Sequence, residues 1–493
     1  MKTLSDPRWS GPRRAASALL LALCSGCAVG PNYQRPSVPQ ADTYTAYKEL
    51  AGWQPAAPAD ALQRGPWWQM FGDETLNNLA ARVEVSNQNV AQAVAAYAQA
   101  RALVREQRAS LFPVVSLNGG ANRSGNGSST GAARSNFQLG IGASWEPDVW
   151  GRLGRAGTAA SAAADASAAD LASARLASQG ELAVNYLSLR QVDQQLDLLA
   201  TTTLGYARAA EITQNRYNAG VVAKTDVLQA QTQLANAQAD AAGLQRQRAQ
   251  LAHAIAVLVG VAPGTFSLPA VDGRLRGGAG TAMAADTAAD RGQPIVPEIP
   301  LGVPSELLQR RPDIAAAERR VAAANEQIGI AKTAYYPSLG LNASYGLGAS
   351  RVADLFIASS SVWSLGLSAA AAVFNAGATG ARVDGSQAAY DQTVARYRQT
   401  VLAAFQDVED QLAAASVLKT QQQLRRQASN AADQVEQQAL NRYRSGLAGY
   451  TDVITAQTTA LNARRALVQA TADRQTTAVA LIQSLGGGWQ VGQ

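Results

Sequence analysis

The feature that most constrains the fold of this chain is an internal repeat. Residues Arg216–Gln231 read RYNAGVVAKTDVLQAQ, and Arg442–Gln457 read RYRSGLAGYTDVITAQ, an offset of 226 (442 − 216) in a chain of 493 residues. A repeat at nearly half the chain length indicates a duplicated structural unit. Each copy has a glycine where a helix can end, followed by Thr-Asp, which favours a new helix start. Each unit is therefore predicted to contain a hairpin of two long helices that turns at Gly220 or Gly446.

The segments around these turns are rich in Ala, Gln and Leu and contain no proline. They predict long helical hairpins at about 155–259 and 381–485. At about 1.5 Å per residue, the first helix of each hairpin is longer than an ordinary globular domain is wide. Such helices must pack against partners as a rod or a tube.

Four segments change to a two-residue period, which indicates strands. Apolar residues alternate with Gly, Ser, Asn or Gln over 137–146, 338–347 and 363–369, and more weakly over 115–120. They predict two β-hairpins, one in each repeat, at about 114–148 and 338–374. The length and the one apolar face fit strands that cross a membrane, although ordinary surface hairpins have the same alternation.

The strands limit how the chain could enter a membrane. The sequence has no run of 18 apolar residues, so it predicts no transmembrane helix. Four strands cannot close a barrel, and lipid tolerates no open strand edge, so several protomers would have to share one barrel: two would give eight strands and three would give twelve. The polar row suits a water-filled lumen, which the larger barrel provides.

The first 26 residues are typical of a lipoprotein signal peptide. Basic residues precede a short apolar run, Ala15–Leu23, and small residues then lead to Cys27. Cleavage there would make Cys27 the acylated first residue, and no other cysteine would remain for a disulfide or a metal site. Cys24 at position −3 departs from the usual pattern, and an ordinary secretory peptide is the alternative. Ala28 stands where Asp would favour inner-membrane retention, so we expect the outer membrane.

The remaining boundaries follow from composition and periodicity. Residues 27–72, rich in proline and aromatic residues, are predicted to form a lipid-anchored extended segment. Repeat 1 spans 73–260 and repeat 2 spans 304–486, with an irregular equatorial linker at 261–303 and a C-terminal tail at 487–493. In repeat 1 the helical periodicity runs from Asp73 toward Pro113 without a predicted break. In repeat 2 the first helix is expected to start at Pro312.

Composition argues against two other functions. The net charge is +6, and Lys and Arg do not cluster with aromatic residues, so no nucleic-acid partner is expected. The single histidine, His253, lies on an Ala-rich helix, and no nucleophile motif, metal cluster or phosphate loop accompanies it. We therefore expect neither an enzyme nor a cofactor or metal, apart from the covalent lipid on Cys27.

Several motifs together resemble the outer membrane factor family, the TolC/OprM-like exit ducts, and specifically its NodT-type lipoprotein branch. They are the doubled Arg-Tyr-x-x-Gly…Thr-Asp-Val and four segments, 27–36, 67–73, 304–314 and 331–338. The resemblance covers nearly the whole mature chain. It implies an α+β membrane protein, a homotrimer in which four strands per protomer form one twelve-stranded outer-membrane β-barrel, continuous with a long periplasmic α-helical barrel. It also implies docking on a periplasmic membrane-fusion adaptor and an inner-membrane RND-type pump, with export of drugs or other toxic small molecules.

The resemblance also assigns roles at the hairpin tips. The position of Asp452 lines the narrowest ring of the duct in similar proteins, which would give a trimer three carboxylates at its periplasmic mouth. Thr455 stands where some relatives have a second Asp, so this ring should be weaker. The alternative, that Asp452 and Asp226 only cap their helices, is compatible with a role in the ring. In relatives, the residues that match Tyr443 and Asp226 hydrogen-bond and hold the mouth shut.

The turns themselves should contact the adaptor through Gly220, Val221, Gly446 and Leu447. An Arg that sometimes follows the second turn is Ala448 here, so a second lock bond is not expected. Two alternatives remain open: a duct for type I protein secretion, and a lipid-anchored periplasmic helical rod or adaptor. The sequence leaves open the exported substrate and which adaptor and pump are served.

Overall fold

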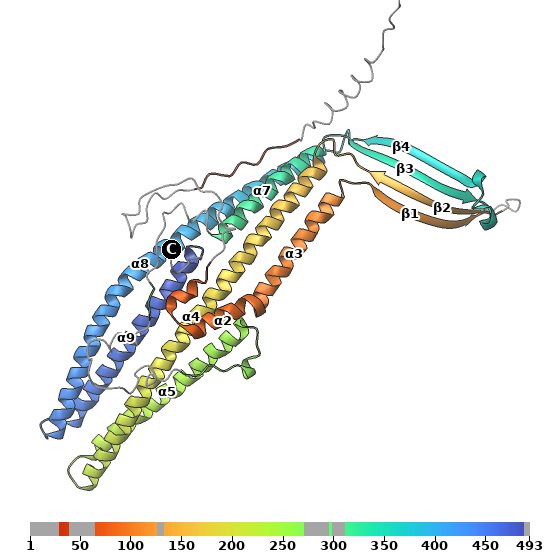
Figure 1. Cartoon of the computed structure of the whole chain (residues 1–493). Coiled ribbons are helices and arrows are strands. Elements are labelled where there is room, and N and C mark those ends of the chain that lie inside the picture. Colours follow the sequence, from red (N-terminus) through yellow and green to blue (C-terminus); the bar gives the residue numbers. More distant parts are fainter. Residues whose placement is uncertain (1–28, 39–64, 126–132, 271–294, 298–310, 488–493) are drawn as a thin grey trace, which may run out of the picture. The chain divides into compact units, whose positions relative to one another are not determined.

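The computed structural model describes residues 29–38, 65–125, 133–270, 295–297 and 311–487 (Figure 1). The first repeat contains α2 (Glu74–Ser86), α3 (Gln88–Ala109), β1 (Val114–Ser124), β2 (Arg134–Trp145), α4 (Arg152–Asn218) and α5 (Lys224–Leu258), and it is flanked by η1 (Trp67–Phe71) and η2 (Pro263–Thr265). The second contains α7 (Pro312–Thr333), β3 (Ser338–Ala349), η3 (Val352–Asp354), η4 (Ala358–Ser360), β4 (Ser361–Ala370), α8 (Ala378–Arg444) and α9 (Tyr450–Ser484). Contacts divide the chain into unit 1 (1–38, 96–168, 316–399) and unit 2 (39–95, 169–315, 400–493).

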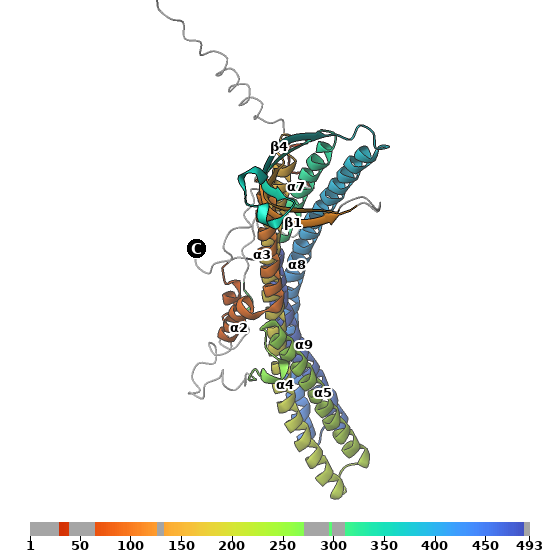
Figure 2. The same ribbon diagram turned by 90° about the vertical axis from the view of Figure 1, so that its right-hand side faces the viewer.

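The two helical hairpins match each other in length as well as in sequence. Helices α4 and α8 have 67 residues each, and α5 and α9 have 35 each. Their starts keep the offset of the repeat, since 378 − 152 and 450 − 224 both equal 226. Within unit 2, α5 lies beside α4 and α9 lies beside α8 in both views (Figures 1 and 2). The long helices begin at 152 and 378, three residues before the predicted starts.

Both hairpins turn at the predicted glycines. Gly220 has a φ of 73° and Gly446 a φ of 74°, the left-handed region that favours glycine. In the first turn, the Val221 N–H donates to the Arg216 carbonyl at 2.8 Å, and the equivalent bond from Leu447 has the same length. These six-residue closures are Schellman motifs, which satisfy carbonyls at the helix end. The glycine at each turn therefore explains why both first helices end at this position.

The four strands form one antiparallel sheet in the order β1-β2-β3-β4. Each repeat contributes one hairpin, and β2 pairs with β3 to join the two. Gly140 lies opposite Gly346 in that central pair. A Cβ on Gly346 would come within 2.9 Å of the Leu139 carbonyl oxygen, so the two repeats meet where there is no room for a side chain.

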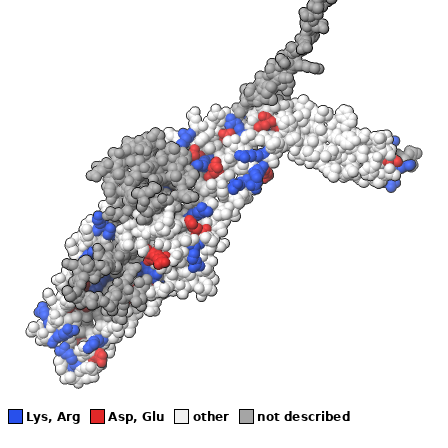
Figure 3. Space-filling model, in the orientation of Figure 1, with Lys and Arg blue, Asp and Glu red and all other residues white. Residues whose placement is uncertain are grey.

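The sheet has one apolar and one polar face. Large exposed side chains form a row across all four strands: Leu117, Ile141, Tyr345 and Trp363. On the other face, glycines alternate with small polar residues, and the Ser344 and Ser364 hydroxyls lie 2.8 Å apart. Figure 3 shows the surface over the strands free of charged residues except at the far tip, whereas Lys, Arg, Asp and Glu are scattered over the helices.

The core of unit 2 explains the aromatic residues that precede the first helix. Trp67, Trp68 and Phe71 are buried in one cluster with apolar residues of α2, α4, α5 and α9. Asp73 then caps α2, because its Oδ1 accepts a hydrogen bond from the Leu76 N–H at 3.1 Å. Segment 65–72 is thus a packed element of unit 2, in contrast to the extended segment that its composition predicts.

The helix predicted from Asp73 onward is divided in two. Asn87 interrupts it with extended backbone (φ −69°, ψ 128°). Its buried side chain accepts hydrogen bonds from the N–H groups of Asn89 and Val90 and donates to the Leu258 carbonyl at 2.8 Å. The periodicity of α2 and α3 hides this break, because the bond that stabilises it comes from a residue far along the chain.

In unit 1, residues 29–38 form an extended strap across α4, α7 and α8. Arg155 donates to the Pro31 carbonyl at 3.3 Å and forms an ion pair of 2.7 Å with Glu326; the two side chains are only 9% and 11% exposed. The Tyr33 hydroxyl donates to Glu318. The strap begins two residues after Cys27, which itself lies outside the described residues.

Candidate functional site

The tips of the two helical hairpins present the predicted contact residues. Gly220 and Gly446 form the turns, and the next residue in each is an exposed apolar side chain. Val221 is 62% exposed and Leu447 is 72% exposed. Each turn therefore displays one apolar side chain to solvent in the single chain, which suits contact with another protein.

The two predicted carboxylates, Asp226 and Asp452, lie in the first turns of α5 and α9, the second helices of the two hairpins. The helix dipole favours negative charge at this end of a helix. Asp452 accepts a hydrogen bond from the Gly449 N–H at 3.3 Å, and its side chain remains exposed. Thr455, one turn further on, is also exposed and donates to the Thr451 carbonyl at 2.9 Å. Asp226 is half-buried in the first turn of α5. Capping thus leaves the Asp452 carboxylate accessible.

Tyr443 has different partners from those expected. Its hydroxyl is buried and has no hydrogen-bond partner among the described residues. The guanidinium carbon of Arg216 lies over the Tyr443 ring, 4.9 Å from its centroid, and the Tyr450 ring lies 5.5 Å away. The hydrogen bond between Tyr443 and Asp226 is not formed within this single protomer, and it stays a prediction for the assembled protein.

Tyr450 completes a cluster between the two hairpins. It is buried against Ala230 and Val453. Burial raises the pKa of Tyr450 above its ordinary value, and the nearby Tyr443 adds to the rise. Sequence reasoning missed Arg216 and Tyr450 as contact residues. Both residues lie inside the repeated motif, which is the one sign of their importance in the sequence. The motif does not reveal that α4 and α8 lie against each other at this point.

The remaining candidate residues take no part in this cluster. His253 is exposed on α5. No group of three or more His, Cys, Asp or Glu side chains suited to a metal ion occurs within the described ranges. In the same ranges, no helix is both long and apolar enough to cross a bilayer.

The described strands have one apolar face, and their only charged residues are Arg123 and Arg134 at the β1–β2 tip. Such a sheet in one chain with duplicated helical hairpins of great length defines a class: an outer-membrane channel. Residues 79–261 and 303–487 match the family described as "Outer membrane efflux protein". The chain belongs to this family, and the two matched segments correspond to the two repeats.

Individual relatives agree along nearly the full chain. The toluene efflux pump outer membrane protein TtgC of Pseudomonas putida is 32% identical over 489 residues, which cover 97% of this chain and 96% of the relative. The solved outer-membrane channel OprN is 29% identical, with a TM-score of 0.80 over 94% of this chain and 100% of that one. The MtrE channel of Neisseria gonorrhoeae, solved in an open state, is 27% identical, with a TM-score of 0.78 over 94% of this chain and 98% of that one.

These comparisons confirm the predicted family, fold and location. The protein is an efflux channel of the Gram-negative outer membrane with a helical part that extends into the periplasm. The relatives are channels, so the alternative that the chain is a periplasmic rod or adaptor is wrong.

Proposed function

We propose that three copies of the chain close one twelve-stranded barrel by pairing the β1 edge of each protomer with the β4 edge of the next. The main support is the sheet, which has one apolar and one polar face. Its outer strands β1 and β4 each have one edge that pairs with no other described strand. In lipid, such edges must be paired. In this barrel the apolar face of the sheet would contact the lipid, and the face of Gly, Ser and Asn residues would line a lumen wide enough for water.

This duct passively conducts drugs or other toxic small molecules from the periplasm to the exterior. A relative named as part of a toluene efflux pump supports small apolar cargo. The helical tips, with Gly220, Val221, Gly446 and Leu447, dock a membrane-fusion adaptor that links the duct to an RND-type pump. The exposed apolar side chains at both turns support that contact. Export of proteins by a type I system remains the second candidate.

We further propose that the tips carry a gate that is closed at rest. Three copies of Asp452 form a ring of negative charge, with Thr455 as a neutral layer one turn away. Such a ring attracts cations and repels anions. A hydrogen bond between Asp226 and Tyr443, formed on assembly, holds the ring shut. The buried hydroxyl of Tyr443, which has no partner in the described part of the chain, supports a bond of this kind.

The chain is anchored by palmitate and diacylglycerol on Cys27, which adds outer-membrane lipid to its partners. The signal pattern before Cys27 supports this lipidation. No other cofactor is proposed.

Single-channel conductance in planar bilayers, with the mass of the purified complex measured alongside, tests the proposal. We expect a trimer that gives small, cation-preferring steps. Asp226→Ala and Tyr443→Phe should each enlarge the steps, while the control His253→Gln, on an exposed face of α5, should not. A monomer that never conducts would overturn the duct, and unchanged steps in both lock variants would overturn only the lock.

A further inference from the structure

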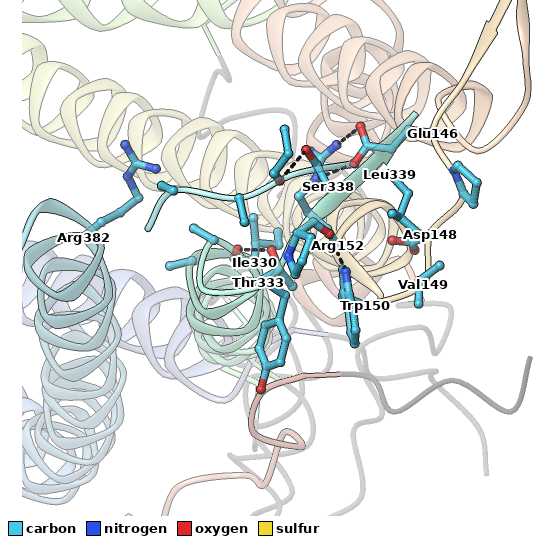
Figure 4. A pocket seen from close by; sticks show the side chains of 18 of the residues that line it. Glu146, Asp148, Val149, Trp150, Arg152, Ile330, Thr333, Ser338, Leu339 and Arg382 are labelled. Atoms are coloured by element: carbon cyan, nitrogen blue, oxygen red, sulfur yellow. Dashed lines mark hydrogen bonds and ion pairs between the residues drawn. The ribbon is translucent and has the colours of Figure 1, made fainter. Parts of the chain in front are cut away.

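A cavity of about 530 Å³ lies in unit 1, where the helices give way to the strands. It is open to solvent on one side and is lined by the β2–α4 connection, the end of α7, the starts of β3 and α8, and the residues at and after the end of β4 (Figure 4). Its volume falls in the range of small-molecule and cofactor sites. Its apolar wall contains Val149, Trp150, Ile330, Tyr336, Pro337 and Leu339.

This wall is held in place by a ring stack and a hydrogen bond. The Trp150 ring stacks on Tyr336 with centroids 4.8 Å apart, and its indole N–H donates to the Pro337 carbonyl at 2.7 Å. Rings of this kind, apolar with one polar end, favour the boundary between lipid and water. At the start of the sheet the cavity is lined by Leu339, the first residue of β3 on the apolar face, and by the facing pair Ser338 and Ala370 of the polar face. The apolar face is therefore reached from the cavity at Leu339.

The rim of the cavity is polar. Arg152 forms an ion pair of 2.7 Å with Glu146, and Arg382 lies at the opposite end from these residues in Figure 4. An apolar wall below a polar rim suits a molecule with both characters, such as the glyceryl ester region of a lipid. A fully apolar molecule would cover this rim without forming a hydrogen bond to it.

The start of the strap is fixed at this wall. The Val29 N–H donates to the Trp150 carbonyl at 3.2 Å. Gly30 has a φ of 123°, and a Cβ on it would come within 2.5 Å of the Gly329 Cα, so the strap lies directly on α7. Cys27 is two residues before Val29, and two residues span at most about 7 Å.

We propose that the cavity binds the glyceryl ester region of the lipid on Cys27, whose acyl chains then continue over the apolar face of the sheet. The inference rests on the lipidation proposed above. The occupant is this covalent lipid, because a tether of two residues gives it a local concentration that a free phospholipid must exceed to displace it. The lipid then fixes the level of the strand–helix junction in the membrane as well as tethering the chain.

Hydrogen exchange on the full-length protein in phosphatidylcholine nanodiscs tests the site. The lipidated form is compared with a form made with an ordinary secretory signal and Cys27→Ser, and mass spectrometry first establishes whether Cys27 is acylated. An unacylated wild type would refute the lipidation, whatever the cavity does. With acylation present, we expect exchange about tenfold slower at 149–151 and 330–336 in the lipidated form, with no change at the tip 216–222.

Equal exchange in the two forms would overturn the proposal, because the cavity would then be empty or filled by bilayer phospholipid in both. A filling variant sharpens the test. Ala334 lines the cavity, so Ala334→Trp should abolish the difference between the two forms at 149–151. The control His253→Trp, which adds the same ring outside the cavity, should preserve that difference.

Discussion

The two faces of the sheet can be distinguished with one pair of neighbouring substitutions on β4. Leu365 lies in the middle of the strand, is 73% exposed and belongs to the apolar face. Ser364 precedes it and points to the opposite face, where its hydroxyl lies 2.8 Å from that of Ser344. Leu365→Arg and Ser364→Arg therefore place the same charge on opposite sides of one strand.

The expected magnitudes differ because the two faces meet different solvents. An arginine on the lipid face near the bilayer midplane costs about 2–4 kcal/mol. With 1.36 kcal/mol for each factor of ten, this lowers the folding equilibrium about 30- to 900-fold per protomer. Ser364→Arg places the charge in a watery lumen and loses one hydrogen bond, about 0.5–1.5 kcal/mol. Its main effect is to narrow the lumen with three guanidinium groups and reduce the conductance.

Urea unfolding of protein folded into lipid vesicles measures the stabilities, and bilayer recording measures the conductance. Leu365→Phe, which keeps the apolar character, is the control and should unfold like the wild type. If Ser364→Arg destabilises more than Leu365→Arg, the assignment of the faces is reversed. If both behave alike, the sheet does not separate lipid from water.

Three further predictions concern the helical part. Arg216→Gln removes the cation over the Tyr443 ring and should lower the local stability of the hairpin tips by about 0.5–2 kcal/mol. The loss is measured as faster hydrogen exchange at 440–450, and Arg216→Lys should give an intermediate rate. An unchanged exchange rate in the Gln variant would contradict this prediction. Glu326→Gln leaves the Arg155 charge buried without its counter-ion and should cost about 3–5 kcal/mol in urea unfolding, while replacing both residues with apolar ones should recover most of the loss. Burial raises the pKa of Tyr186 to about 12, so the unfolded chain loses the phenolic proton first. The stability from Tyr186 should be constant below pH 10 and fall between pH 10 and 12, and Tyr186→Phe should remove that slope.

The parts of the fold that have local causes can be predicted from the amino-acid sequence alone. The repeat predicts two helical hairpins, and the glycines at 220 and 446 end their first helices because they adopt a left-handed conformation at little cost. Strict alternation predicts the strands, since a period of two places every second side chain on one face. The motifs that carry the family resemblance are likewise readable in the linear sequence.

Other features depend on residues far apart in the chain, and no local pattern predicts them. Asn87 breaks a periodic helix because its side chain is bonded to the Leu258 carbonyl, 171 residues away. Tyr443 packs under Arg216 because two helices from different repeats meet there. The strap rests on α7 through contacts between segments that are about 300 residues apart, such as the bond from Asn325 to the Pro31 carbonyl, which spans 294 residues. Periodicity records which face of an element is apolar, whereas the partner of that face is set by packing between segments that are distant in sequence.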